Sequence, residues 1–249
     1  MAIKFEHNEV VGWEHAIRGM RNPMNSWDRS DSAWTINNFE DTDAESGDVG
    51  RVLYKDPFAT SIRYELGKND ADLMMRLAKG GRVHAKYRRM ITVYVDVTAP
   101  LYWWKEFDTY KIATVANSCS TMHKIAAKEF TLEDFSCEHL TSRAKDILLK
   151  DLIDELNHYR NLYLNGGDDN WADSDDEDYE PKDKRIWWQM IQLLPSSYNQ
   201  KRTIMLNYEV LNNIYKSRKD HRLDEWREFC KWIEGLPYSE IITGKECEV

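Results

Sequence analysis

The sequence predicts an α+β fold, and three observations favour that class. Residues 88–97 alternate apolar and polar side chains with the two-residue period of a strand that buries one face. Residues 141–164 instead repeat apolar side chains at helical spacing. Strand patterns stop early in the chain, and every later element reads as a helix, which is typical of α+β rather than alternating α/β proteins. We therefore expect a central mixed or antiparallel sheet packed with helices, and a helical second half.

The first half of the chain gives a mixture of strands and helices. Turn-forming residues, cap residues and changes of apolar period mark the boundaries, and Asn69 is the expected N-cap of the second helix, which Gly80–Gly81 ends. Pro100 ends the strongest strand, and an aromatic helix follows it. The expected elements are a helix at Glu9–Met20, a strand at Ala59–Leu66, a helix at Asp70–Lys79, a strand at Arg88–Val97 and a helix at Leu101–Ile112.

The second half reads as a series of helices. Thr141–Leu164 has the clearest apolar stripe, and Pro181 is expected to begin the next helix, which Pro195 closes. Two further helices are expected at Asn199–Lys216 and Arg222–Glu234.

No linker rich in Pro, Gly or Ser separates two hydrophobic halves, so residues 1–249 are expected to form one domain. Residues 21–50 are polar and weakly periodic, and we interpret them as a long loop or extension that covers a site, reaches a neighbouring subunit, or is disordered. Residues 165–181 carry a dense acidic run and are expected to be a solvated loop insertion.

Composition excludes several classes of function. The net charge of −9 argues against general nucleic-acid binding, and no run approaches the roughly 20 apolar residues of a membrane span. The amino terminus lacks an apolar signal region, and the four cysteines show no CxxC spacing. We expect a cytoplasmic protein with no metal site.

Residues 114–121 are all small and mostly polar, which suits either a ligand that approaches the backbone or a tightly packed helix crossing. The ten tryptophans and thirteen tyrosines suit core packing or ring stacking in a ligand site. His84 precedes the strongest strand and is either a structural hydrogen-bonding group or a functional one.

The order of these pieces resembles the flavin-dependent thymidylate synthases, the ThyX family. The resemblance spans most of residues 59–242: a strand, a helix, a turn with Gly81 and His84, a strand ending in Ala99–Pro100, and an aromatic helix. A Leu-Pro element, Leu194–Pro195, then precedes a segment in which Asn207, Leu211, Arg218 and Asp220 keep the family's relative spacing.

The family signature R-H-R-x-x-S-x-N-E-x-S-x-R is replaced in this chain. An ungapped alignment from Ala99–Pro100 puts Thr109, Tyr110 and Lys111 at R-H-R, and it puts Thr114, Ala116, Asn117, Cys119 and Thr121 at the later positions. A one-residue insertion would instead match Asn117 to the asparagine and Ser120 to the second serine. The two arginines that help the family to hold anions are therefore absent. Anion binding would be weakened unless Lys111, Lys124 or Arg202 substitutes for them.

The resemblance implies reductive methylation of dUMP to dTMP, with FAD as redox carrier, NADPH and methylenetetrahydrofolate as co-substrates, and sites shared within a homotetramer. Two alternatives stay open: another modification of a pyrimidine nucleotide, such as hydroxymethylation, and a non-catalytic nucleotide-binding or assembly protein. No catalytic residue is assigned, because the family needs no cysteine nucleophile, and Cys119 is expected to be a small buried thiol. The implied substrate-binding residues are Arg218, Glu106, Ser120 and Cys119, and the implied cofactor-binding residues are Asn207, His84, Lys111, Tyr110, Thr114 and Asn117.

Overall fold

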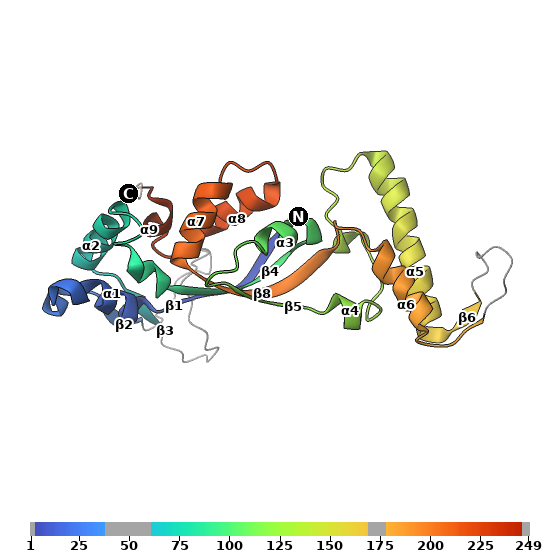
Figure 1. The fold of residues 1–249 in the computed structure, drawn as a ribbon, viewed down its shortest axis with the longest axis horizontal. Helices are drawn as coiled ribbons and strands as arrows, with labels where there is room; N and C mark the ends of the chain where they lie inside the picture. The colour runs from blue at the N-terminus through green and yellow to red at the C-terminus, as the bar shows by residue number, and fades with distance from the viewer. Residues whose placement is uncertain (1–2, 38–60, 169–177, 246–249) are drawn as a thin grey trace. The chain divides into compact units, whose positions relative to one another are not determined.

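The protein is described by a computed structural model that covers residues 3–37, 61–168 and 178–245 (Figure 1). The chain divides into two compact units, and the prediction of one single domain remains a prediction. The first unit comprises Met1–Lys4, Thr98–Thr109 and Ser118–Arg202, and the second comprises Phe5–Val97, Tyr110–Asn117 and Thr203–Val249.

Four strands form an antiparallel sheet in the order β1-β4-β8-β5, so the predicted α+β class is confirmed (Figure 1). Along β4 the side chains of Val93, Val95 and Val97 are buried, whereas Tyr94 between them is exposed. The period-two prediction for this strand is therefore also confirmed. The strands are β1 (Lys4–Val11), β4 (Thr92–Pro100), β5 (Val115–Ser118) and β8 (Asn199–Asn207).

Helix α7 is largely buried within the second unit. The side chains of Tyr208, Leu211 and Ile214 are each fully buried. It packs against α8, α9 and the short helix η3 (Figure 1). The elements of this unit outside the sheet are α1 (Trp13–Arg21), η1 (Asn22–Met24), η2 (Trp27–Arg29), the hairpin strands β2 (Ala33–Asn37) and β3 (Ser61–Glu65), α2 (Lys68–Lys79), η3 (Lys86–Arg89), α7 (Tyr208–Arg218), α8 (Asp224–Glu234) and α9 (Glu240–Thr243).

The first unit packs α5 against α6 over a core that includes Phe130, Phe135, Leu156 and Met190. Trp103 and Trp104 are fully buried, so packing explains these two aromatic side chains. The elements are α3 (Leu101–Phe107), α4 (Thr121–Lys124), η4 (Leu132–Asp134), the π-helical η5 (Ala144–Leu149), α5 (Lys150–Asn165), β6 (Gly167–Asp168), β7 (Asp178–Tyr179) and α6 (Lys184–Leu193).

The helix expected at Asn199–Lys216 is wrong, because its first half is strand β8 and only its second half belongs to helix α7. An inner place in the sheet satisfies the backbone of β8 on both sides and buries Ile204 and Leu206, which overrides local helix propensity. Strand β8 and the short strands β6 and β7 are therefore exceptions within the expected helical second half, whose other long elements are helices.

The helix expected at Glu9–Met20 is also wrong in its first turn, because Glu9–Val11 ends strand β1 and α1 begins at Trp13. Gly12 joins the two elements with φ of 95°, and a Cβ atom there would lie 2.1 Å from the Met90 carbonyl oxygen. Only glycine permits this turn without strain.

The loop expected at residues 21–50 contains regular structure where it is described: η1, η2 and β2 occupy most of residues 22–37. Residues 38–50 lie outside the described residues, as do residues 59–60 of the expected strand and most of the expected acidic loop, residues 169–177.

Several predicted boundaries shift. Helix α2 starts at Lys68, with Asp31 rather than Asn69 capping it, and α3 ends at Phe107 instead of Ile112. Strand β4 starts four residues later than expected because residues 86–89 form η3. Helix α6 begins after the Asp183 cap instead of at Pro181. The long helix expected at Thr141–Leu164 is confirmed as η5 and α5.

Candidate functional site

A cleft of about 1040 Å³ opens in the second unit, and His84 contributes to its lining. Three segments form its walls: residues 19–29, the α2 residues 69–77, and residues 83–90. Such a volume lies at the upper end of the range for small-molecule and cofactor sites. Exposed apolar side chains, among them Met24, Val83 and Met90, give part of the lining a surface suited to a ring system.

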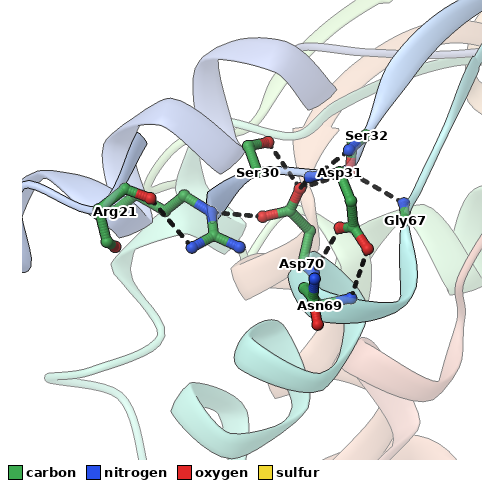
Figure 2. Close-up of polar contacts among 8 residues, drawn as sticks. Arg21, Ser30, Asp31, Ser32, Gly67, Asn69 and Asp70 are labelled. Carbon is green, nitrogen blue, oxygen red and sulfur yellow. Dashed lines mark hydrogen bonds and ion pairs between the residues drawn. The ribbon is translucent and has the colours of Figure 1, made fainter. Parts of the chain in front are cut away.

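The buried carboxylate of Asp70 ties the first wall to the second (Figure 2). Its Oδ1 accepts a 2.6 Å hydrogen bond from Arg21 Nε, and its Oδ2 accepts from the hydroxyls of Ser30 and Ser32, each at 2.7 Å. Asp31 lies just after the first wall, and its carboxylate accepts from the backbone N–H groups of Asn69 and Asp70 at the start of α2. The two walls are thus fixed to each other by charge-assisted bonds.

Burial by itself would raise the pKa of Asp70. The hydrogen bonds from Ser32, Ser30 and Arg21, together with the positive charge of Arg21, outweigh that effect and hold the pKa below its usual value. Asp70 is therefore ionised at neutral pH and neutralises Arg21, which lines the cleft.

The remaining basic groups of the lining are Arg29, Arg76 and Lys86, and its acidic groups are Asp28 and Asp72. Basic side chains therefore outnumber acidic ones here, although the chain as a whole has a net charge of −9. Within the part of the chain that the structure describes, the side chains of Arg29 and Lys86 have no hydrogen-bonding or ion-pair partner. Two exposed cations beside an apolar lining suit a ligand that carries both phosphate and a planar ring.

His84, in the third wall of the cleft, packs against Gly80. Its backbone N–H donates to Gly81 O at 3.0 Å, and its ring is so close to Gly80 that a Cβ there would lie 3.2 Å from His84 Cδ2. Gly81 has φ of 87°, a conformation that side chains rarely adopt. The Gly80–Gly81 pair, expected to end the helix and, through Gly81, to share a turn with His84, therefore shapes the turn that carries His84.

A second cluster in the same unit surrounds Arg218, at the carboxyl end of α7. Arg218 Nε donates to the Tyr110 hydroxyl at 3.0 Å, and Nη1 lies 3.0 Å from His221 Nε2. The guanidinium lies over the ring of the buried Trp226, with Cζ 4.6 Å from the centroid. These contacts fix the plane of the guanidinium, which is the group that binds carboxylates, phosphates and pyrimidine carbonyls through two parallel bonds.

Asn207 lies at the other end of the same helix. Its Oδ1 accepts from Val210 N at 3.0 Å and so caps α7, and the residue is buried. Eleven residues at 1.5 Å each separate Asn207 from Arg218 by roughly 16 Å. The start of α7 contacts the residue that follows the third wall, since Tyr208 N donates to Ile91 O. Asn207 and Arg218 thus lie at opposite ends of α7, and neither lines the cleft.

Three further predicted residues follow Tyr110 in the second unit. Lys111 is exposed, Asn117 lies on the fully exposed strand β5, and Thr114 is half-buried. Thr114 Oγ1 is a buried hydroxyl without a hydrogen-bond partner among the described residues. Residues 114–121 do not form the helix crossing that was one of the two interpretations, because β5 occupies 115–118 and only a short helix follows it.

The other three predicted residues belong to the first unit. Ser120 caps α4, with its hydroxyl 2.7 Å from His123 Nδ1, and the Glu106 carbonyl accepts from Thr109 Oγ1. Cys119 is exposed, so the expectation of a small buried thiol is wrong; its backbone N–H donates to Lys201 O next to the edge of the sheet.

Sequence reasoning missed the cleft lining apart from His84. Lys86, Arg29 and Arg76 carry no motif, and they come together only because Asp70 joins segments 40 residues or more apart in the chain. The cluster Asp28, Arg29, Ser30, Asp31, Ser32 was the one local signal, since it is unusually rich in capping and charged residues.

Within the described ranges, no group of three or more His, Cys, Asp or Glu side chains is arranged to hold a metal ion. The helices of those ranges are all too short or too polar to cross a membrane.

Comparison with solved structures places this fold beside two crystal structures of the Helicobacter pylori flavin-dependent thymidylate synthase ThyX, each complexed with FAD and dUMP. One has 14% sequence identity and a TM-score of 0.56, and the match covers 99% of both chains. The other has 13% identity and a TM-score of 0.57, covering 99% of this chain and 98% of the other. Neither a protein-family model nor a curated protein sequence matches the chain. At this identity the likeness establishes a shared fold.

Proposed function

We propose that this protein is a flavin-dependent enzyme of pyrimidine nucleotide metabolism that methylates dUMP reductively to dTMP. FAD would be its redox carrier, and NADPH and methylenetetrahydrofolate would be its co-substrates. The observation that carries the proposal is the fold likeness over 99% of both chains to a ThyX enzyme in complex with FAD and dUMP. Fold alone does not determine chemistry, so the candidate sites must supply the rest of the support.

The lining of the cleft supports a flavin dinucleotide as the ligand of this proposal. Lys86 and Arg29 offer cations for the pyrophosphate, and Met24, Val83 and Met90 offer apolar surface for a ring. Bound FAD would supply hydride transfer, and the residues of this chain would bind it, orient it and exclude water. The cleft cations would take over the anion-binding role of the arginines that the signature segment lacks.

The Arg218 cluster supports the nucleotide half of the proposal. Tyr110 and His221 fix the guanidinium on Trp226, so that binding a pyrimidine carbonyl or a phosphate loses little side-chain entropy. Tyr110 occupies a signature position, and its contact with Arg218 gives that segment a role in orienting the substrate-binding group.

Flavin binding tests the proposal. The purified protein should be yellow with a flavin absorption band, or should bind added FAD and show a raised melting temperature. A colourless protein whose melting temperature does not respond to FAD would favour the non-catalytic alternative. Identification of the product from dUMP would distinguish methylation from hydroxymethylation.

We further propose a homotetramer in the cytoplasm, with sites completed by neighbouring subunits. The exposed strand β5, with Val115 58% exposed and Ile112 beside it 86% exposed, offers an apolar edge for such assembly.

A further inference from the structure

A buried carboxylate on α7 contacts both ends of the turn that forms the third wall of the cleft. Glu209, the second residue of α7, is buried, and its Oε1 lies 3.3 Å from Arg82 Nε. Its Oε2 lies 3.9 Å from Arg88 Nη1. Arg82 and Arg88 flank residues 83–87, which include the cleft residues His84 and Lys86.

Packing and one side-chain hydrogen bond also hold the turn, because η3 contacts α1 and α7 and the side chains of Ala85 and Tyr87 are buried. The Tyr87 hydroxyl donates to Met74 O in α2 at 2.9 Å, and burial raises the pKa of Tyr87 to about 12, so it remains a donor at neutral pH. His84 and Ala85 N–H both donate to Gly81 O, a bond within the turn itself. Within the described residues, the two ion pairs of Glu209 are the charged contacts between this turn and α7, and they add direction to the packing of η3 on the helix.

The geometry of the buried Glu209–Arg88 pair indicates that the pair positions the turn more than it stabilises the fold. Arg88 Nε and Glu209 Oε2 are both buried without a hydrogen-bond partner among the described residues, and unmade hydrogen bonds of this kind are unfavourable. A buried ion pair with such gaps is weak evidence for stability, since apolar residues of similar size would serve the core as well. The start of α7 provides a compensating effect, because the helix dipole favours a carboxylate in its first turn.

We propose that Glu209 is a positioning residue that holds the turn 83–87 against α7 and so presents Lys86 and His84 to the ligand in the cleft. The ligand class rests on the proposed function: a dinucleotide whose pyrophosphate contacts Lys86. Glu209 itself does not line the cleft. It acts through the two arginines.

The first test needs no ligand. Amide hydrogen exchange in Glu209→Gln should accelerate at least tenfold for residues 82–90 while β4 stays protected. Glu228→Gln removes an exposed α8 carboxylate paired with Lys231 and is the matched control, with no change expected in the turn. Unchanged exchange in the turn would overturn the proposal, and so would a rise spread evenly over the whole unit.

A milder variant keeps the test valid if Glu209→Gln fails to fold. The Arg82 side chain is 69% exposed, so Arg82→Ala endangers the core little. It should accelerate exchange at residues 82–85 and leave Arg88 and Met90 N–H protected by their carbonyl partners in the turn. Unaltered exchange at residues 82–85 would contradict the proposal that the Arg82–Glu209 ion pair holds this end of the turn.

The second test uses FAD as the probe. Glu209→Gln should weaken FAD binding at least tenfold, and Glu209→Asp should restore part of the affinity, because it keeps the charge. Lys86→Ala combined with Glu209→Gln should weaken binding less than the product of the two single effects, since both act through Lys86. Independent effects would overturn the assignment. If the wild type binds no FAD, the proposed function fails, and the exchange experiment still decides the role of Glu209.

Discussion

Arg218 Nε donates a 3.0 Å hydrogen bond to the hydroxyl of Tyr110, 108 positions earlier in the chain. The contact joins the end of α7 to the segment in which the ThyX signature would fall. Tyr110 stands where the family signature has histidine. Its hydroxyl orients the Arg218 guanidinium, which lies on the ring of Trp226.

Arg218→Ala should weaken dUMP binding at least tenfold, because the variant loses a charged donor pair. Arg218→Lys should restore only part of the affinity, since an ammonium lacks the planar fork. Isothermal titration with dUMP measures both. Affinity that stays unchanged in Arg218→Ala would return this residue to a structural role.

Tyr110→Phe tests the orienting bond separately. Loss of one hydrogen bond of about 0.5–1.5 kcal/mol should weaken dUMP binding roughly two- to tenfold while the ring still packs on Trp226. Equal dUMP affinity in Tyr110→Phe and the wild type, measured by the same titration, would show that the bond does not prepare the site.

The lowered pKa of Asp70 predicts that the free energy of unfolding depends on pH in the acid range. Its pKa is lowered in the folded state, so its contribution is complete above the unfolded value of about 3.9 and disappears as pH falls through the lower folded pKa. Asp70→Asn should lower the free energy of unfolding at pH 7 by up to about 3–5 kcal/mol, because Arg21 is left buried and uncompensated.

Urea denaturation of Asp70→Asn between pH 7 and pH 3 measures this effect, and the difference from the wild type should shrink at the acid end. Asp72→Asn, an exposed change one half-turn along the same helix, is the matched control. A difference from the wild type that stays constant with pH would contradict the assignment of the lowered pKa to Asp70.

Lys86 and Lys111 are competing candidates for the phosphate of FAD, the first from the cleft and the second from the signature alignment. The cleft predicts that Lys86→Ala weakens FAD binding by about 1.5–3 kcal/mol, and that the wild-type affinity declines with salt. Lys216→Ala, on the exposed side of α7, should have no effect. A large effect of Lys111→Ala with none from Lys86→Ala would move the cofactor away from the cleft.

The proposed homotetramer predicts a scattering mass near four times 29.5 kDa. Multi-angle light scattering at micromolar concentration measures it. A monodisperse monomer would remove the argument that sites are completed by neighbouring subunits.

The α+β class and strand β4 followed from the sequence because a one-sided sheet imposes an alternation that Val93, Val95 and Val97 display directly. Strand β8 did not follow, since its polar first half, Asn199–Thr203, has no such alternation and only its neighbours in the sheet define it. The regular structure of residues 22–37 was missed for a related reason. It depends on Asp70, more than 35 positions away.

The candidate site divides in the same way. Arg218 could be found because its spacing from Asn207 resembles a known family, and the structure places it in an oriented cluster. Lys86 could not, because no local pattern distinguishes it from any other exposed lysine. The role proposed for it rests on its place in the cleft, whose walls Asp70 joins.

Release of tritium from dUMP labelled at C5 tests the central claim most directly, because methylation at C5 must expel the hydrogen bound there. The proposed function predicts release that requires FAD, NADPH and methylenetetrahydrofolate together, stops when any one is omitted, and falls in Arg218→Ala. No release from protein that is folded and supplied with all three would contradict thymidylate synthesis, and the fold would then be serving another function.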